Sequence, residues 1–211
     1  MHKKKINAIL DILSKEYAGA KCALNFRSPY ELLVATILSA QCTDERVNMV
    51  TEKLFKVYNT PEKMAELTEE QLGEKIKSCG FYNNKSKNII AATREILTKH
   101  GGEVPRNFDD LVALPGVGRK TANVVMSNAF GVPAIAVDTH VFRVSNRLGL
   151  AKGKTPDEVE QGLMKNIPRE MWSDAHHYII WHGRKVCNAR KPKCEECSLA
   201  PYCEFYSKTN K

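Results

Sequence analysis

The sequence predicts an all-α fold. Apolar side chains recur at spacings of three and four residues, as at Ile6, Ile9, Leu10 and Leu13, which is the period of an amphipathic helix. Alternating patterns typical of strands are scarce, and the apolar run 134–137 is only four residues long. Serine or threonine followed by proline recurs as a helix-start signal. We therefore expect nine to eleven short helices.

Capping residues and glycines mark the expected helices in chain order. The first helix covers the amphipathic stretch around 6–13, and Ser28 with Pro29 and Glu31 predicts an N-cap, a first-turn proline and a capping box. Further starts are expected at Thr60, Thr68 (with Gln71 completing a capping box), Asp138 and Thr155. Helix ends are expected at Gly80, Gly101, Gly102, Gly131 and Gly149.

A glycine-rich connection, 114–118, separates helices expected over 108–113 and 119–130. Its glycines allow a tight hairpin whose backbone N–H groups point outward beside a helix N-terminus, which makes an anion site. In a helix-hairpin-helix unit, that anion is a nucleic-acid phosphate. The predicted DNA contacts of the hairpin are Gly116, Val117, Gly118 and Arg119.

Two charged side chains beside helix starts are the candidate chemical groups. Lys120 lies in the first turn after the hairpin, where the helix dipole disfavours a cation, so its position indicates either a nucleophilic amine or a phosphate contact. Asp138 precedes the next helix, as an N-cap aspartate does. Capping would also fix this carboxylate for use as a base or to stabilise a cation.

Four of the seven cysteines fall near the C-terminus, with the spacing Cys-x6-Cys-x2-Cys-x5-Cys. An odd count argues against a disulfide framework, and the residues between the four cysteines are too polar for a core. Four thiolates so close in sequence predict a metal site, either a tetrahedral zinc or an iron–sulfur cluster. The predicted ligands are Cys187, Cys194, Cys197 and Cys203.

The basic excess lies at the two ends of the 211-residue chain. The net charge of +8 divides into +4 over residues 1–30 and +4 over residues 184–211, and the residues between them carry 19 side chains of each sign. This distribution excludes an evenly basic protein. A metal-stapled basic loop would suit phosphate contacts, and its predicted DNA-binding cations are Arg184, Arg190, Lys191 and Lys193.

The chain carries no pattern of a secretory leader or a membrane span. Asn7 and Asp11 interrupt the apolar run at the N-terminus, and the longest apolar stretch, around 32–38, is far too short to cross a bilayer. We expect a cytoplasmic protein that makes no membrane contact.

With these motifs in hand, the chain resembles the endonuclease III family of helix-hairpin-helix DNA glycosylases/AP lyases over essentially its full length. The resemblance rests on 114–122, 137–140, 182–184 and the cysteine spacing. It implies one [4Fe–4S] cluster per chain on the four cysteines. It also implies two helical domains flanking a DNA-binding cleft: a six-helix domain over 22–133 with its hairpin at 114–119, and a cluster domain formed by 1–21 with 134–211.

The resemblance also implies the roles of individual residues. Lys120 would be the nucleophile and Asp138 its acidic partner, the two facing each other across the cleft. Gln41 would fill the space left by a flipped nucleotide, and Phe81, where leucine is common, would be a second wedge or simply an aromatic packed at a helix end. His140 would line the lesion pocket, whereas His176, His177 and His182 are interpreted as packing residues.

The implied function is bifunctional base excision repair: removal of oxidised pyrimidines, then strand cleavage 3′ to the abasic site by β-elimination through a lysine Schiff base. The expected partner is double-stranded DNA that contains damaged pyrimidines or abasic sites. We expect a monomer in a bacterial or archaeal cytoplasm, associated with the nucleoid through DNA.

Three other functions are weighed against this one. An adenine-specific mismatch glycosylase would carry an extra C-terminal domain and lack the lysine, whereas this chain has Lys120 and only eight residues after Cys203. A non-catalytic DNA-binding protein would use the cluster for structure or redox sensing. A small electron carrier would be acidic, without ligands in a basic loop.

Overall fold

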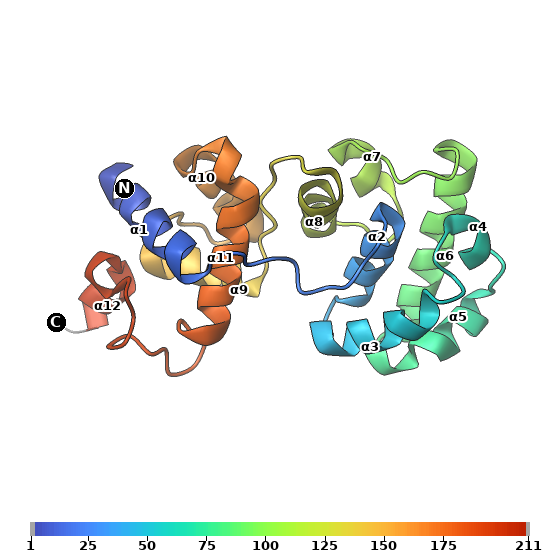
Figure 1. The fold of residues 1–211 in the computed structure, drawn as a ribbon, viewed down its shortest axis with the longest axis horizontal. Coiled ribbons are helices and arrows are strands. Elements are labelled where there is room, and N and C mark those ends of the chain that lie inside the picture. The colour runs from blue at the N-terminus through green and yellow to red at the C-terminus, as the bar shows by residue number, and fades with distance from the viewer. Residues whose placement is uncertain (1–2, 210–211) are drawn as a thin grey trace. The chain divides into compact units, whose positions relative to one another are not determined.

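The computed structural model describes residues 3–209, which contain twelve α-helices and three short 3-10 helices (Figure 1). No strand occurs among these residues. The all-α prediction is confirmed, but the expected nine to eleven helices were too few. The α-helices are α1 (Lys3–Glu16), α2 (Pro29–Leu38), α3 (Asp44–Leu54), α4 (Pro61–Met64), α5 (Glu69–Ile76), α6 (Tyr82–Lys99), α7 (Phe108–Ala113), α8 (Arg119–Phe130), α9 (Thr139–Leu148), α10 (Pro156–Asn166), α11 (Trp172–Lys185) and α12 (Glu204–Thr209). The 3-10 helices are η1 (Lys77–Cys79), η2 (Arg169–Met171) and η3 (Ala200–Tyr202).

The predicted helix starts are confirmed by their capping hydrogen bonds. The side chains of Ser28, Thr60 and Thr155 each accept the amide three residues further on, and Thr68 forms a complete capping box with Gln71. The box predicted at Ser28 is wrong in one detail. The Glu31 carboxylate accepts the amide of Arg27 at 2.6 Å instead of the amide of Ser28, so it secures the residue before the cap.

The chain divides into two compact units. The hairpin unit consists of residues 22–131. Its α2 is buried on all sides, from Tyr30 to Leu38, so this helix forms the centre of the unit's core. The Tyr30 hydroxyl and Thr93 Oγ1 lie 2.6 Å apart, which ties α2 to α6, the longest helix (Figure 1).

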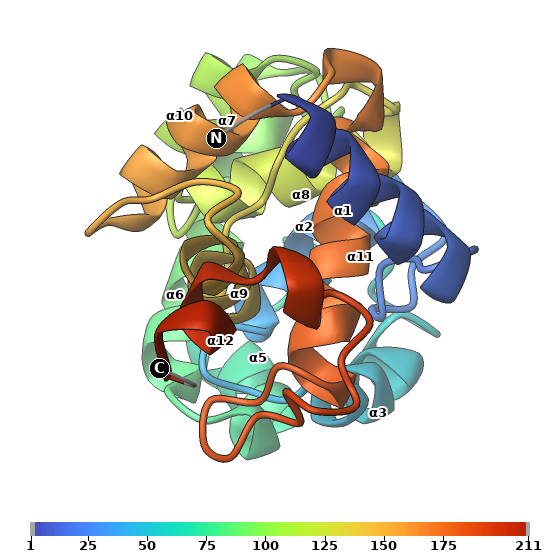
Figure 2. The same ribbon diagram turned by 90° about the vertical axis from the view of Figure 1, so that its left-hand side faces the viewer.

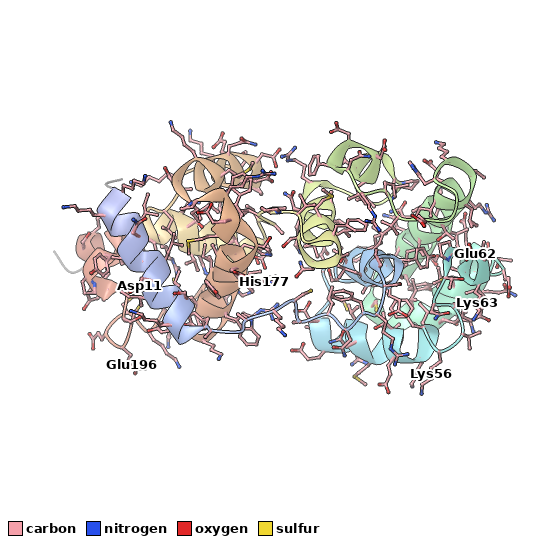
Figure 3. The ribbon with its side chains drawn as sticks, turned by 45° about the horizontal axis from the view of Figure 1, so that its top comes forward. Asp11, Lys56, Glu62, Lys63, His177 and Glu196 are labelled. Atoms are coloured by element: carbon pink, nitrogen blue, oxygen red, sulfur yellow. The ribbon has the colours of Figure 1, made fainter. Side chains whose placement is uncertain are left out.

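The cysteine unit combines the N-terminal segment, up to Lys21, with the chain from Val132 onward. Its core contains buried apolar side chains of α1, α9, α10 and α11. The stripe of α1 packs against α11, and Figure 2 shows α1 running alongside that helix. The predicted stripe of Ile6, Ile9, Leu10 and Leu13 is fully buried in this core. The outer face of α1 is charged and carries Asp11, which pairs with Lys15 (Figure 3).

The run 134–137 is buried but forms no strand. It leads directly into α9, so its burial fixes the position of the Asp138 cap. None of the helices within residues 3–209 has the length and apolar character needed to cross a membrane.

Candidate functional site

The glycine hairpin joins α7 to α8 in a tight turn. The amide of Val117 donates to the carbonyl of Leu114 at 3.1 Å, and Gly116 has a φ of +75°, a conformation that favours glycine. A Cβ at Gly116 would lie 2.8 Å from the Cβ of Asn88, so space as well as φ requires glycine here. Gly118 caps α8 without a side-chain hydrogen bond. The exposed start of α8 therefore has the geometry of an anion site.

The side chains that follow the hairpin differ in exposure. Lys120 is exposed in the first turn of α8. The Arg119 guanidinium stacks over the ring of Phe108 at 4.8 Å, which locks the two helices of the motif together. Val117 is buried, so the hairpin offers backbone at this position. The motif therefore presents the primary amine of Lys120, a group that can act as a nucleophile, to solvent.

Gln41 lies exposed in the turn between α2 and α3. The amide of Cys42 donates to the carbonyl of Ser39 at 3.1 Å, which closes a four-residue turn with Gln41 in its third position. Gln41 has a φ of +52°, where glycine or asparagine is usual. The turn thus displays a large amide side chain at the site of a strained backbone.

Phe81 repeats this arrangement between η1 and α6. It has a φ of +48° and is 68% exposed, the most exposed large hydrophobic side chain among residues 3–209. The alternative of an aromatic packed at a helix end does not fit this exposure. The wedge role that the resemblance implies needs an exposed side chain, and it stays a prediction.

Left-handed backbone coincides with predicted DNA contacts. Within residues 3–209, the non-glycine residues with positive φ are Gln41, Phe81 and Lys191. Such residues cost about 1–3 kcal/mol each and cluster at functional sites. The resemblance implies a DNA contact for Gln41 and Phe81, and the charge of the basic loop predicts one for Lys191, in each case without reference to backbone conformation.

Asp138 caps α9 as predicted, because its Oδ1 accepts the amide of Val141 at 2.7 Å. Its carboxylate is half-buried and lies near His140. Burial lowers the pKa of His140, and the Asp138 carboxylate acts in the opposite direction. His140 Nδ1 lies 3.1 Å from the guanidinium of Arg143. Asp138 is therefore fixed by its backbone contact and remains partly accessible.

The glycine of the motif at 182–184 allows α9 and α11 to pack closely. A Cβ at Gly183 would lie 3.0 Å from the Cβ of His140 and 3.1 Å from Val144. The Gly183 carbonyl accepts from Arg143 at 2.9 Å. This contact sets the position of His140 relative to the end of α11.

The four C-terminal cysteines line one cavity, together with residues that include Leu148, Val186 and Phe205. Burial, and to a lesser extent the neighbouring thiols, raise the pKa of Cys194 and Cys197, and a bound cation would favour their thiolate forms. Within residues 3–209, no three His, Cys, Asp or Glu side chains are grouped tightly enough for a single metal ion. Four thiols around one cavity fit the donor set of an iron–sulfur cluster.

Sequence reasoning missed the side chains that surround these cysteines. The Arg147 guanidinium donates to Cys187 Sγ at 3.4 Å and to the carbonyls of Asn188 at 2.7 Å and Ala189 at 3.0 Å. Arg143 donates to the Cys187 carbonyl at 3.0 Å. Their spacing of four residues on α9 places both arginines on one face, which is the sequence signal that they share.

His182 does more than pack. Its Nδ1 lies 3.1 Å from the Tyr17 hydroxyl, and its Nε2 lies 3.6 Å from Cys197 Sγ. A metal-bound thiolate only accepts hydrogen bonds, so Nε2 then carries the proton and Nδ1 accepts from Tyr17. The interpretation of His176 and His177 as packing residues agrees with their burial on α11 (Figure 3), but for His182 it was incomplete.

The basic loop after α11 folds back on itself, because the Lys193 amide donates to the Val186 carbonyl at 3.1 Å. Arg190 and Lys191 are exposed between these two residues. The exposed Arg184 lies with its guanidinium 5.9 Å from the Trp181 ring, at the end of α11. Glu196, further along the loop, is also exposed (Figure 3). The loop thus presents a cluster of cations beside the cysteine cavity.

The candidate residues are therefore divided between the two units. In the hairpin unit they are Gln41, Phe81, the hairpin residues and Lys120. In the cysteine unit they are Asp138, His140, the basic loop and the four cysteines.

Comparison with known proteins gives two family matches. Residues 34–169 match the model of the HhH-GPD superfamily of base excision DNA repair proteins. Residues 187–203, which begin and end at predicted cysteine ligands, match the model of the iron–sulfur binding domain of endonuclease III.

Curated relatives and solved structures agree with these matches. Endonuclease III of Escherichia coli is 50% identical over 210 residues and that of Rickettsia conorii 50% over 206, with 100% and 98% of each chain covered. That of Bacillus subtilis is 51% identical over 209 residues, which cover 99% of this chain and 95% of the relative. A trapped endonuclease III–DNA covalent intermediate superposes with a TM-score of 0.95 at 49% identity, covering 100% of both chains. A thermostable thymine-DNA glycosylase follows with a TM-score of 0.86 at 27% identity, over 97% of this chain and 98% of the other.

Proposed function

The chain belongs to the endonuclease III family of HhH-GPD base excision DNA repair proteins, and we propose that Lys120 is its nucleophile and Asp138 its acidic partner. The protein is a bifunctional DNA glycosylase/AP lyase whose partner is DNA and whose cofactor is a [4Fe–4S] cluster. One observation carries the proposal: the exposed amine of Lys120 lies in the first turn of α8, directly behind a hairpin built to hold a phosphate.

The proposed chemistry follows from the properties of an amine. The damaged pyrimidine is flipped out of the duplex, which costs a few kcal/mol of unstacking. Lys120 Nζ then forms a bond to C1′ as the glycosidic bond breaks and the base leaves with the bonding electrons. Asp138 takes part in removing the proton that the amine loses and stabilises the developing positive charge. Its capping hydrogen bond holds the carboxylate in one orientation for this task.

The product of this step is an aminal, and opening of its C1′–O4′ bond, with a proton delivered to O4′, gives the protonated Schiff base that makes the second reaction possible. The protonated imine withdraws electrons and acidifies the C2′ proton. Removal of that proton expels the 3′ phosphate oxygen by β-elimination, which breaks the strand 3′ to the lesion. A side chain without a primary amine supports base removal alone.

We assign the remaining residues to DNA and to the cofactor. Gln41 and Phe81 occupy the space that the flipped nucleotide leaves, and His140 lines the lesion pocket. The hairpin and the basic loop contact phosphates through backbone amides and cations. Cys187, Cys194, Cys197 and Cys203 hold the cluster, which fixes the basic loop when bound. Oxidised pyrimidines are the proposed lesions, and the bacterial nucleoid is the proposed location.

Borohydride trapping on duplex DNA with an abasic site tests the nucleophile, because borohydride reduces a Schiff base to a stable amine. We expect a covalent complex with the wild-type protein and none with Lys120→Gln, while DNA binding is largely kept. The matched control is Lys99→Gln, since Lys99 is also an exposed helical lysine of the hairpin unit. Absence of trapping by cluster-loaded wild-type protein would contradict the lyase mechanism. Equal losses of binding and trapping in Lys120→Gln would favour a phosphate contact instead.

A further inference from the structure

A buried lysine joins the two segments that carry Gln41 and Phe81. We call residues 39–43 and 79–81 the wedge segments. The first follows Leu38, the last residue of α2, and the second starts at Cys79, the last residue of η1. The Lys85 ammonium donates to the carbonyls of both residues, at 2.8 Å each. One side chain thus spans the two chain ends from which the wedge segments project.

Further contacts strengthen this connection. The Lys85 backbone amide donates to the Phe81 carbonyl at 3.0 Å, so Lys85 bonds on both sides of Gly80. The Cys42 and Cys79 thiols, one from each wedge segment, also lie close enough for Cys42 to raise the pKa of Cys79. The two wedge segments are 36 or more residues apart in sequence, and these contacts hold them together.

The position of Lys85 is costly. Only 6% of the residue is exposed, and burial lowers its pKa, which is the sign of a cation removed from water. A buried ammonium needs hydrogen-bond acceptors, and its partners here are the backbone carbonyls at the base of the two segments. A purely apolar side chain would fill the same space without burying a charge, but it would leave both carbonyls without this donor, so a fixed partner for the two carbonyls is the gain that the lysine offers.

We propose that Lys85 is a positioning residue for lesion extrusion, which holds Gln41 and Phe81 at a fixed separation so that both act on the duplex together. The proposal rests on the wedge roles assigned above. A wedge side chain opens a stack of nucleobases only if the backbone that carries the side chain does not move. The strained backbone at Gln41 and Phe81 would relax if the carbonyls behind them were free to move. Lys85 opposes that movement without touching DNA or the reacting atoms.

Lys85→Met tests the proposal, because it removes the ammonium and keeps the length of the aliphatic stem. The rate of borohydride trapping is measured on an abasic site in duplex DNA and on the same site in a single strand. A single strand needs no wedge, because it has no paired stack to open. We expect the duplex-to-single-strand rate ratio to fall at least about tenfold, which corresponds to the loss of hydrogen bonds to a charged group.

The control variant is Lys87→Met, an exposed lysine two residues further along α6. We expect it to leave the ratio unchanged. If Lys85→Met lowers both rates equally, its role is in stability alone and the proposal is wrong. If Lys85→Met fails to fold, Lys85→Gln takes its place, since the shorter amide cannot reach both carbonyls. An unchanged ratio in that variant would likewise overturn the proposal.

Gln41→Ala and Phe81→Ala separate this proposal from the one on which it rests. If neither lowers the ratio although the wild-type protein is trapped, the wedge roles themselves are wrong. If they lower the ratio and Lys85→Met does not, only the positioning role fails. If Lys85 acts through these residues, combining Lys85→Met with Gln41→Ala should lower the ratio by less than the product of the single effects.

Discussion

Replacing Gly116 by alanine tests whether the hairpin is held by backbone geometry. Gly116 has a φ of +75°, and an added Cβ would lie 2.8 Å from Asn88 Cβ and 3.0 Å from Asn88 Nδ2. The amide of Asn88 can rotate away, but its Cβ is attached to the backbone of α6. The substitution must therefore both strain the turn and push the hairpin away from α6.

The expected loss of stability is the sum of these two effects. A left-handed conformation costs an L-residue about 1–2 kcal/mol. Overpacking a site that cannot relax costs about 1–3 kcal/mol more. We therefore expect Gly116→Ala to lower the free energy of unfolding of the hairpin unit by about 2–5 kcal/mol, measured from urea denaturation followed by circular dichroism.

Gly118→Ala is the matched control two residues away. Gly118 has a φ of −93°, and no atom lies within 4 Å of a Cβ built there. Alanine fits this backbone, so we expect stability to be unchanged or to rise by about 0.4–1 kcal/mol through a less flexible unfolded chain. The methyl group would nevertheless stand at the exposed start of α8, so DNA affinity should fall. Equal stabilities of the two variants would refute this account of the hairpin.

Two further predictions concern the cysteine unit. Burial lowers the pKa of His176 to about 3 in the folded protein. Below the unfolded pKa near 6.5, the unfolded chain therefore binds a proton that the folded protein does not bind, and the free energy of unfolding decreases as the pH is lowered. We expect the free energy of unfolding to decrease by about 2 kcal/mol between pH 7 and pH 5, and to depend less steeply on pH in His176→Gln, as measured from urea midpoints at each pH. Equal pH dependence in the two proteins would contradict this prediction. Arg147→Lys removes the guanidinium that binds the loop at Cys187 through several hydrogen bonds. In the presence of a chelator, the visible absorbance of the cluster should then disappear about tenfold faster than in the wild-type protein. The exposed Arg190→Lys should match wild type.

Much of the fold could be predicted because its signals are local. A cap such as Thr68 with Gln71 is decided by residues three apart in sequence. The helix end at Gly131 is decided by the glycine itself, which has the positive φ typical of such ends. Glu31 shows the limit of such reasoning. Its carboxylate had two amides within reach and bonded to Arg27, a choice that depends on how the chain enters the helix.

The environment of the site could not be predicted, because it depends on contacts between distant residues. Lys85 reaches a carbonyl 47 residues away, and His182 lies 165 residues from Tyr17. In sequence, Lys85 is one of several lysines on a polar helix, and nothing nearby distinguishes it from Lys87. The chemical groups themselves, Lys120 and the four cysteines, were recognisable because hairpin and ligand spacings are local patterns.

The backbone at Gln41 and Phe81 joins these two kinds of information. Stability alone would favour glycine or asparagine at a positive φ, and Gly80 beside Phe81 shows that the chain uses glycine where only the backbone matters. A glutamine and a phenylalanine at such positions sacrifice stability for a side chain directed outward. The buried ammonium of Lys85 is a second unfavourable feature directly beneath the first. Two costs at one place, each avoidable by a simple substitution, are what the proposed wedge and positioning roles predict for these segments.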